Sequence, residues 1–126
     1  MRYGFFGTQS VGKTTLLNAL RSEPDLNNFT FIDNITRSVE AEGFKIKEAG
    51  DDSTQMQIAR KHAENVILHE HFITDRTIID CYAYSIYLYR RGKVKFCTLQ
   101  KVRQYAKYLL PQFTYLFYLP IEFANV

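Results

Sequence analysis

The chain has 126 residues, of which 46% are hydrophobic and 23% charged, and its formal net charge is +3 at pH 7. These values predict a single globular domain with a sizeable core, and the mildly basic balance suits an anionic ligand without requiring nucleic acid. Cys81 and Cys97 have no histidine at metal-ligand spacing, which argues against a zinc site and a disulfide framework. Cys81 lies among apolar residues and is expected to be a buried thiol.

Membrane and export signals are absent from the sequence. Met1 leads directly into an apolar run without a small-residue cleavage site, and no apolar stretch approaches the roughly 20 residues that span a bilayer. We therefore expect a cytoplasmic protein with no membrane partner. The basic run at 90–95 is interpreted as a solvated turn, because nucleic-acid-binding arms carry longer blocks of like charge.

Strand-like and helix-like segments alternate along the chain. Short apolar runs predict strands at 2–6, 29–32, 69–75 and 113–119, and the last is expected to be covered on both faces. Apolar residues at three- and four-residue steps predict helices at 13–21, 36–44, from Ser53 to 67, from 78 to just before Gly92, and from about 102 to 109. Asp52 or Ser53 is expected to cap the third helix, and Gly43 to end the second in a left-handed conformation.

This alternation predicts an α/β domain of three layers, with a parallel sheet of at least four strands joined by right-handed crossovers. His69 and His71 alternate along the strand-like run at 69–75. Together with His62, they are expected to pack or to face solvent rather than to bind a metal.

The loop after the first predicted strand carries a phosphate-binding motif. It matches G-x-x-x-x-G-K-[ST] and comprises Gly7, Thr8, Gln9, Ser10, Val11, Gly12, Lys13 and Thr14, with Thr15 following in the helix. Its glycines let successive backbone N–H groups turn inward, and the helix N-terminus adds positive charge. Lys13 supplies a cation for the β- and γ-phosphates, and Thr14 a hydroxyl for Mg²⁺. The motif therefore predicts a P-loop fold that binds ATP with Mg²⁺.

The third predicted strand ends in Asp75 and Arg76. Asp75 can hold hydrated Mg²⁺ opposite Thr14, and Arg76 can fork onto phosphate oxygens but cannot act as a base. This pair favours phosphoryl transfer to a bound acceptor over activation of water. The alternative is an ordinary surface ion pair without a catalytic role. The sequence also lacks the D-x-x-G and N-K-x-D motifs of a GTP switch.

Four segments in this order resemble the P-loop nucleoside and nucleotide kinase group. They read "GTQSVGKTT", "TRSVEAEGF", "TDRTIIDCYAYS" and "FTYLFYLPIEF", and they cover nearly the whole chain. Within that group, the chain looks most like AAA-type kinases that include nicotinamide-riboside kinase domains and phage deoxynucleotide or hydroxymethyluridine-DNA kinases.

The resemblance implies roles for further residues. Asp33 follows the second strand, where related kinases place the carboxylate that accepts the acceptor's hydroxyl proton, with Asp75 as the alternative base. Arg37 would hold an acceptor phosphate or the transferred group, and Gln55 would read a base edge. Arg76 matches the arginine of the family motif, followed by Thr77 in place of the usual serine. A turn aspartate and a solvent-facing arginine are the ordinary alternatives for Asp33 and Arg37.

Kinases of this group usually add a fifth strand and an arginine-bearing lid, and the sequence to residue 126 contains neither. We therefore expect one kinase-like domain over 1–126 that lacks these parts, with a sheet edge open to self-association. The predicted function is ATP- and Mg²⁺-dependent phosphoryl transfer to a nucleoside, a nucleotide or a modified-DNA base hydroxyl. The alternative is a nucleotide-binding module with little or no catalysis.

Overall fold

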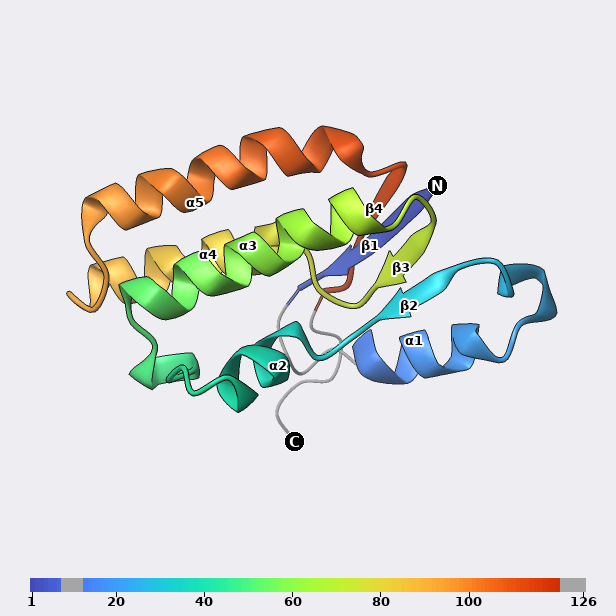
Figure 1. Cartoon of the computed structure of the whole chain (residues 1–126), viewed down its shortest axis with the longest axis horizontal. Coiled ribbons are helices and arrows are strands. Elements are labelled where there is room, and N and C mark those ends of the chain that lie inside the picture. The colour runs from blue at the N-terminus through green and yellow to red at the C-terminus, as the bar shows by residue number, and fades with distance from the viewer. Residues whose placement is uncertain (8–12, 121–126) are drawn as a thin grey trace.

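The computed structural model describes residues 1–7 and 13–120 and, for Thr14, the backbone alone. Helices and strands alternate as expected (Figure 1). In chain order they are β1 (Arg2–Phe6), α1 (Lys13–Arg21), β2 (Thr30–Ile32), α2 (Ile35–Ala41), α3 (Asp52–Leu68), β3 (Phe72–Thr74), α4 (Ile78–Arg90), α5 (Phe96–Leu109) and β4 (Tyr115–Tyr118).

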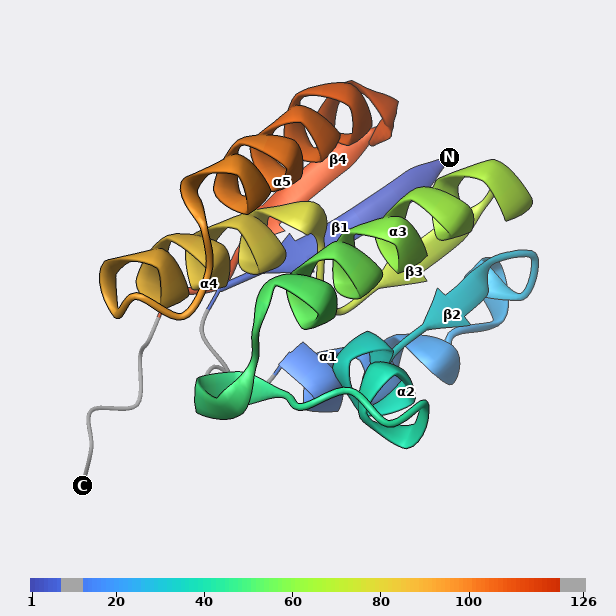
Figure 2. The ribbon, with the colours of Figure 1, turned by 60° about the vertical axis from the view of Figure 1, so that its left-hand side comes forward.

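The four strands form one parallel sheet in the order β2-β3-β1-β4. Helix α1 covers one face, and α3, α4 and α5 pack together over the other (Figures 1 and 2). The predicted three-layer α/β fold with a parallel sheet is therefore confirmed. Because β1 and β3 are neighbours and run in the same direction, their carboxyl ends meet at one edge of the sheet, where ligands of open α/β sheets bind.

Alternate residues of the strands point to opposite faces of the sheet and pack in two separate apolar clusters. On the α1 side, Phe5 and Ile73 pack with Leu17. On the other side, Phe72 joins a larger cluster built mainly from α2, α3, α4 and α5, which includes the predicted buried thiol Cys81. This period-2 division fixes the register of β1 and β3, since a slip of one residue would expose both sets.

The start of α3 differs from the expectation in one detail. Its cap is Asp51, whose Oδ1 accepts a hydrogen bond from the backbone N–H of Thr54 at 3.1 Å, and neither Asp52 nor Ser53 takes that role. Asp52 instead accepts hydrogen bonds from Lys95 N at 2.9 Å and Thr98 Oγ1 at 2.5 Å. It therefore ties the first turn of α3 to the first turn of α5. At the other predicted end, Gly43 does take a left-handed conformation, with a φ of +101°.

The expectation that the last strand is covered on both faces is wrong. Tyr115, Phe117 and Tyr118 are 59%, 44% and 62% exposed, because β4 lies at the edge of the sheet and pairs only with β1 among the described strands. Phe117 still stacks on Phe5, with ring centroids 5.3 Å apart. Self-association through this edge stays a prediction.

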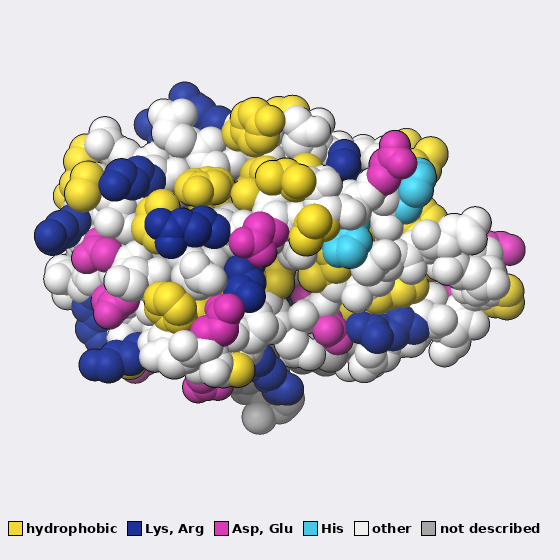
Figure 3. All heavy atoms as spheres, viewed as in Figure 1, with side chains coloured by type: hydrophobic (Ala, Val, Ile, Leu, Met, Phe, Trp, Pro, Cys, Tyr) yellow, Lys and Arg dark blue, Asp and Glu magenta, His cyan; other side chains and the backbone are white. Residues whose placement is uncertain are grey.

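The surface seen in Figure 3 shows lysine and arginine side chains scattered among acidic ones. The stretch at 90–95 forms the turn between α4 and α5, and all but one of its residues are exposed, as expected for a solvated turn. Among the described helices, none is long and apolar enough to cross a membrane.

Gly4 sits where β1 passes closest to the start of α4. A Cβ at this position would lie 2.5 Å from Cγ2 of Thr77 and 2.8 Å from Cε1 of Phe113. We expect Gly4→Ala to lower the free energy of unfolding by about 2 kcal/mol through overpacking, which corresponds to a fall in Tm of roughly 5–8 °C. Thermal denaturation followed by circular dichroism measures this.

A matched double variant tests the cause of that loss. Thr77→Ser removes the nearer methyl group but keeps the hydroxyl, so Gly4→Ala combined with Thr77→Ser should recover part of the lost stability. If the double variant is no more stable than Gly4→Ala alone, the contact with Thr77 is not the cause.

Candidate nucleotide and acceptor site

The carboxyl ends of β1 and β3 bring the predicted phosphate and metal residues together. Gly7 follows β1, Lys13 opens α1, and Asp75 and Arg76 follow β3. The predicted loop residues Thr8, Gln9, Ser10, Val11 and Gly12 lie outside the described residues, as does the side chain of Thr14. Thr15 is exposed in the first turn of α1.

Lys13 is 4% exposed and points back toward the start of its own loop. Its Nζ donates hydrogen bonds to the backbone oxygen of Gly7 at 2.6 Å and to Oδ1 of Asp80 at 3.3 Å. Burial lowers the pKa of Lys13, and the Asp80 carboxylate opposes that effect. The ammonium group is thus held among acceptors at the place where the motif predicts phosphate oxygens.

Asp75 is 3% exposed at the end of β3. Burial raises the pKa of its carboxyl, the nearby Arg76 guanidinium lowers it, and Asp33 raises it further. The turn that follows is held by Thr74, whose Oγ1 donates to the backbone oxygen of Arg76 at 2.9 Å. A buried carboxylate oxygen beside the phosphate lysine is a suitable ligand for Mg²⁺, which prefers one or two carboxylates together with phosphate oxygens.

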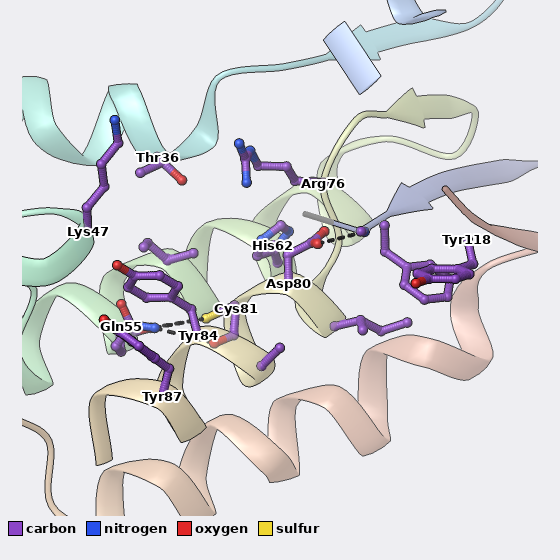
Figure 4. A pocket seen from close by; sticks show the side chains of 15 residues that line it. Thr36, Lys47, Gln55, His62, Arg76, Asp80, Cys81, Tyr84, Tyr87 and Tyr118 are labelled. Carbon is purple, nitrogen blue, oxygen red and sulfur yellow. Dashed lines mark hydrogen bonds between the residues drawn. The ribbon is translucent and has the colours of Figure 1, made fainter. Parts of the chain in front are cut away.

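A cavity of about 460 Å³ opens beside these groups. Its lining comprises Phe6, Gly7, Thr36, Lys47, Gln55, Ile58, His62, Arg76, Ile79, Asp80, Cys81, Ala83, Tyr84, Tyr87 and Tyr118. Figure 4 shows Gln55, Tyr84 and Tyr87 together at one end, Tyr118 at the other, and Arg76, Asp80 and His62 between them. The part of the cavity near Gly7 and Asp80 therefore adjoins Lys13. The opposite end is lined by the rings of Tyr84 and Tyr87 and the amide of Gln55.

Of the residues expected to bind the acceptor, Gln55 and Arg76 line the cavity. Gln55 is 2% exposed, and its Nε2 donates to Oγ of Ser85 at 2.8 Å, which in turn donates to the backbone oxygen of Cys81 at 2.8 Å. This chain fixes the orientation of the amide, because its nitrogen is committed to α4. The carboxamide is therefore rigidly placed at the aromatic end.

Asp33 and Arg37 lie elsewhere. Asp33 pairs with Arg21, with 2.9 Å between Oδ2 and Nη2, and Arg37 is exposed on α2. As far as the described residues form it, the lining includes Thr36 but neither of these two. Asp33 still lies close enough to Asp75 to raise its pKa. The roles predicted for Asp33 and Arg37 stay predictions.

Sequence reasoning missed several lining residues that share helical spacing. Asp80, Tyr84 and Tyr87 follow one another at i, i+4 and i+7 on α4, and Ile58 and His62 lie three and seven residues after the predicted Gln55 on α3. Residues at such steps share one face of a helix. The signal was present, but it is the same pattern that an ordinary core face shows.

His62 is buried between the cavity and the core. Burial lowers its pKa to about 3, and the nearby Arg76 acts in the same direction. The imidazole is therefore neutral in the folded protein at neutral pH. Burial also raises the pKa of the Cys81 thiol to about 12, which leaves it protonated and unreactive. No group of three or more His, Cys, Asp or Glu side chains within the described ranges is arranged to hold a metal ion.

The fold is of the P-loop kinase type. A family model described as an AAA domain matches residues 2–115, and the chain belongs to that family. Among solved structures, deoxyadenosine kinase from M. mycoides, with the products dCMP and a flexible dCDP bound, matches with a TM-score of 0.66 at 18% sequence identity. The match covers 94% of this chain and 63% of that chain, so this chain spans less than two thirds of that kinase's length. No curated protein matches.

The neutral state of His62 predicts a specific dependence of stability on pH. The folded pKa of about 3 lies below the unfolded value near 6.5, so the unfolded chain binds more protons between these values. The free energy of unfolding should therefore fall as the pH drops below about 6.5, by up to about 1.4 kcal/mol per pH unit from this residue.

The comparison variant is His62→Gln, which cannot gain a proton in this range. Urea unfolding at pH 7, 6, 5 and 4 should give a steeper loss for the natural protein than for the variant. Equal slopes for both would contradict a buried neutral imidazole.

Proposed function

We propose that this chain binds ATP with Mg²⁺ at the loop around residues 7–15 and transfers a phosphoryl group to a hydroxyl held in the cavity. The observation that carries the proposal is the layout of the cavity, with Lys13 and Arg76 near one end and Gln55, Tyr84 and Tyr87 lining the rest. The family membership and the fold support it. The acceptor class is a nucleoside, a nucleotide or a modified-DNA base.

The phosphate end would act mainly through positioning and charge. Phosphoryl transfer requires the attacking and leaving oxygens to be in line, with cations around the equatorial oxygens. Lys13 would contact the β- and γ-phosphates, and the guanidinium of Arg76 would bind the transferred group from the side of the cavity. Both side chains approach the same space from neighbouring strand ends, which is the arrangement the reaction needs.

Mg²⁺ would be held by the hydroxyl of Thr14 and the carboxylate of Asp75. Its chemistry would be to neutralise the charge of the phosphates. Burial raises the pKa of Asp75, and a nearby dication would offset this by favouring the ionised carboxylate. Asp33, whose carboxylate is paired with Arg21, would accept the acceptor's proton, with Asp75 as the alternative.

The aromatic end would hold the base of the acceptor. Ring stacking suits Tyr84 and Tyr87, whose ring centroids are 5.3 Å apart, and the fixed amide of Gln55 offers a hydrogen-bonding edge. The neutral His62 adds no charge to the lining between the two ends. This division of the cavity supports a nucleoside-like acceptor.

The first test is phosphoryl transfer from radiolabelled ATP to nucleosides, nucleoside monophosphates and modified DNA. Lys13→Met should lower the turnover by about a hundredfold or more, because a cation at the transferring phosphates is lost. The matched control is Lys101→Met on the exposed face of α5, which should keep the full rate.

The remaining outcomes separate the alternatives. Calorimetric binding of Mg·ATP that Lys13→Met weakens, without transfer to any acceptor, would instead identify a nucleotide-binding module. Absence of both binding and transfer in the folded natural protein would reject the proposal.

Gln55 provides a second test, directed at the acceptor alone. Gln55→Leu should raise the KM of the acceptor by about tenfold, because a base edge would face an apolar side chain. The KM of ATP should stay the same. Gln57→Leu, on the same helix outside the cavity, is the control and should change neither value. An unchanged acceptor KM in Gln55→Leu would remove this residue from the acceptor site.

A further inference from the structure

The carboxylate of Asp80 joins three segments of the site. Its Oδ1 accepts hydrogen bonds from the backbone N–H of Gly7 at 3.1 Å and from Lys13 Nζ at 3.3 Å. Its Oδ2 accepts from the backbone N–H of Thr77 at 2.9 Å, which completes a capping box at the start of α4. One side chain thus links the end of β1, the first residue of α1 and the first turn of α4.

The Asp80 carboxylate is already in contact with a cation, the Lys13 ammonium group. The Lys13 and Asp80 side chains are 4% and 14% exposed, so their attraction is only weakly screened by solvent. The carboxylate also lines the cavity, next to the place where the motif would bring phosphate oxygens. The Lys13 ammonium group is therefore already paired with an anion.

We propose that Asp80 is a positioning residue that holds Lys13 against the end of β1 and competes with the triphosphate for it. This inference rests on the proposed nucleotide site, and it adds a regulator of that site's affinity. When Lys13 turns to a phosphate oxygen, it gives up its contact with Oδ1. The binding free energy of the triphosphate is reduced by the loss of that contact and by the repulsion between the carboxylate and the phosphates.

A plain structural role is the competing explanation, since Asp80 also caps α4. Thr77→Val separates the two roles. It removes the hydroxyl that accepts from the N–H of Ile79 at 3.2 Å, while the contacts of Asp80 with Lys13 and Gly7 involve other atoms. Thr77→Val is therefore a matched loss of capping that leaves the charge pair in place.

Calorimetric titration with Mg·ATP provides the main readout. In Asp80→Asn, the competing charge is absent, and the Kd for Mg·ATP should fall by about fivefold. In Thr77→Val, the Kd should stay within experimental error of the natural value while the Tm falls. Both variants should lose thermal stability, so stability alone does not distinguish the roles, whereas the Kd does.

A double-mutant cycle shows whether Asp80 acts through Lys13. In the Lys13→Met background, where binding is weaker, Asp80→Asn should change the Kd by clearly less than in the natural background. Without any ligand, the losses of Tm in Lys13→Met and Asp80→Asn should be non-additive, because both break the same contact.

Three results would overturn the inference. They are an unchanged or raised Kd in Asp80→Asn, an equal effect in both backgrounds, and a change of Kd in Thr77→Val as large as that in Asp80→Asn. In each of these cases the natural protein still binds Mg·ATP, so the proposed nucleotide site is unaffected. If the natural protein binds no Mg·ATP, both the proposed function and this inference fail.

Discussion

A buried ammonium group requires a partner of opposite charge, and the site is built around that requirement. Lys13 enters the space between the ends of β1 and β3, where burial lowers its pKa, and Asp80 answers it from the first turn of α4. Because Oδ1 of Asp80 also accepts a hydrogen bond from the backbone N–H of Gly7, the carboxylate ties the first turn of α4 to the end of β1. The face of α4 that bears Tyr84 and Tyr87 is thereby placed along the cavity.

Burial shifts the pKa of both the basic and the acidic group at this place, Lys13 and Asp75. It lowers the pKa of Lys13 and raises that of Asp75, so each group is less favourably charged than it would be in water. Neighbouring opposite charges offset this only in part. A ligand that brings both a dication and phosphate oxygens would offset both effects at once, which is what the proposed binding of ATP with Mg²⁺ requires.

Much of the fold could be predicted from the sequence, because local patterns determine it. The strand at 2–6 and the helix at 13–21 have the predicted bounds, and the alternation of elements gave the parallel sheet. The exposure of β4 could not be predicted, because an apolar strand has the same sequence pattern at the centre of a sheet as at its edge. Which strand ends the sheet depends on pairing between distant segments.

Residues of the candidate site that belong to a motif could be predicted from the sequence. Residues that only the packing of the fold brings to the site could not. Lys13, Asp75 and Arg76 follow from spacing at strand ends, whereas Asp80 looks in the sequence like an ordinary helix-capping acid. Its contact with Lys13 joins positions 67 residues apart, so only the fold reveals it. For the same reason, the pairing of the Asp33 carboxylate with Arg21 could not be predicted from the sequence.

The cavity divides its chemistry along its length, and this division limits what it can select. Arg76 and Asp80 lie toward Lys13, whereas the aromatic end carries the charge of Lys47 and offers Gln55 with its nitrogen already bound to Ser85. A rigid amide discriminates by the pattern of donors and acceptors, because a mismatch leaves a buried polar group unpaired. His62, which lies between the two ends, adds no charge. Under the proposed function, selection at the aromatic end would depend on hydrogen-bonding pattern and ring shape, while binding strength at the other end would depend on how readily Lys13 exchanges a carboxylate for a phosphate.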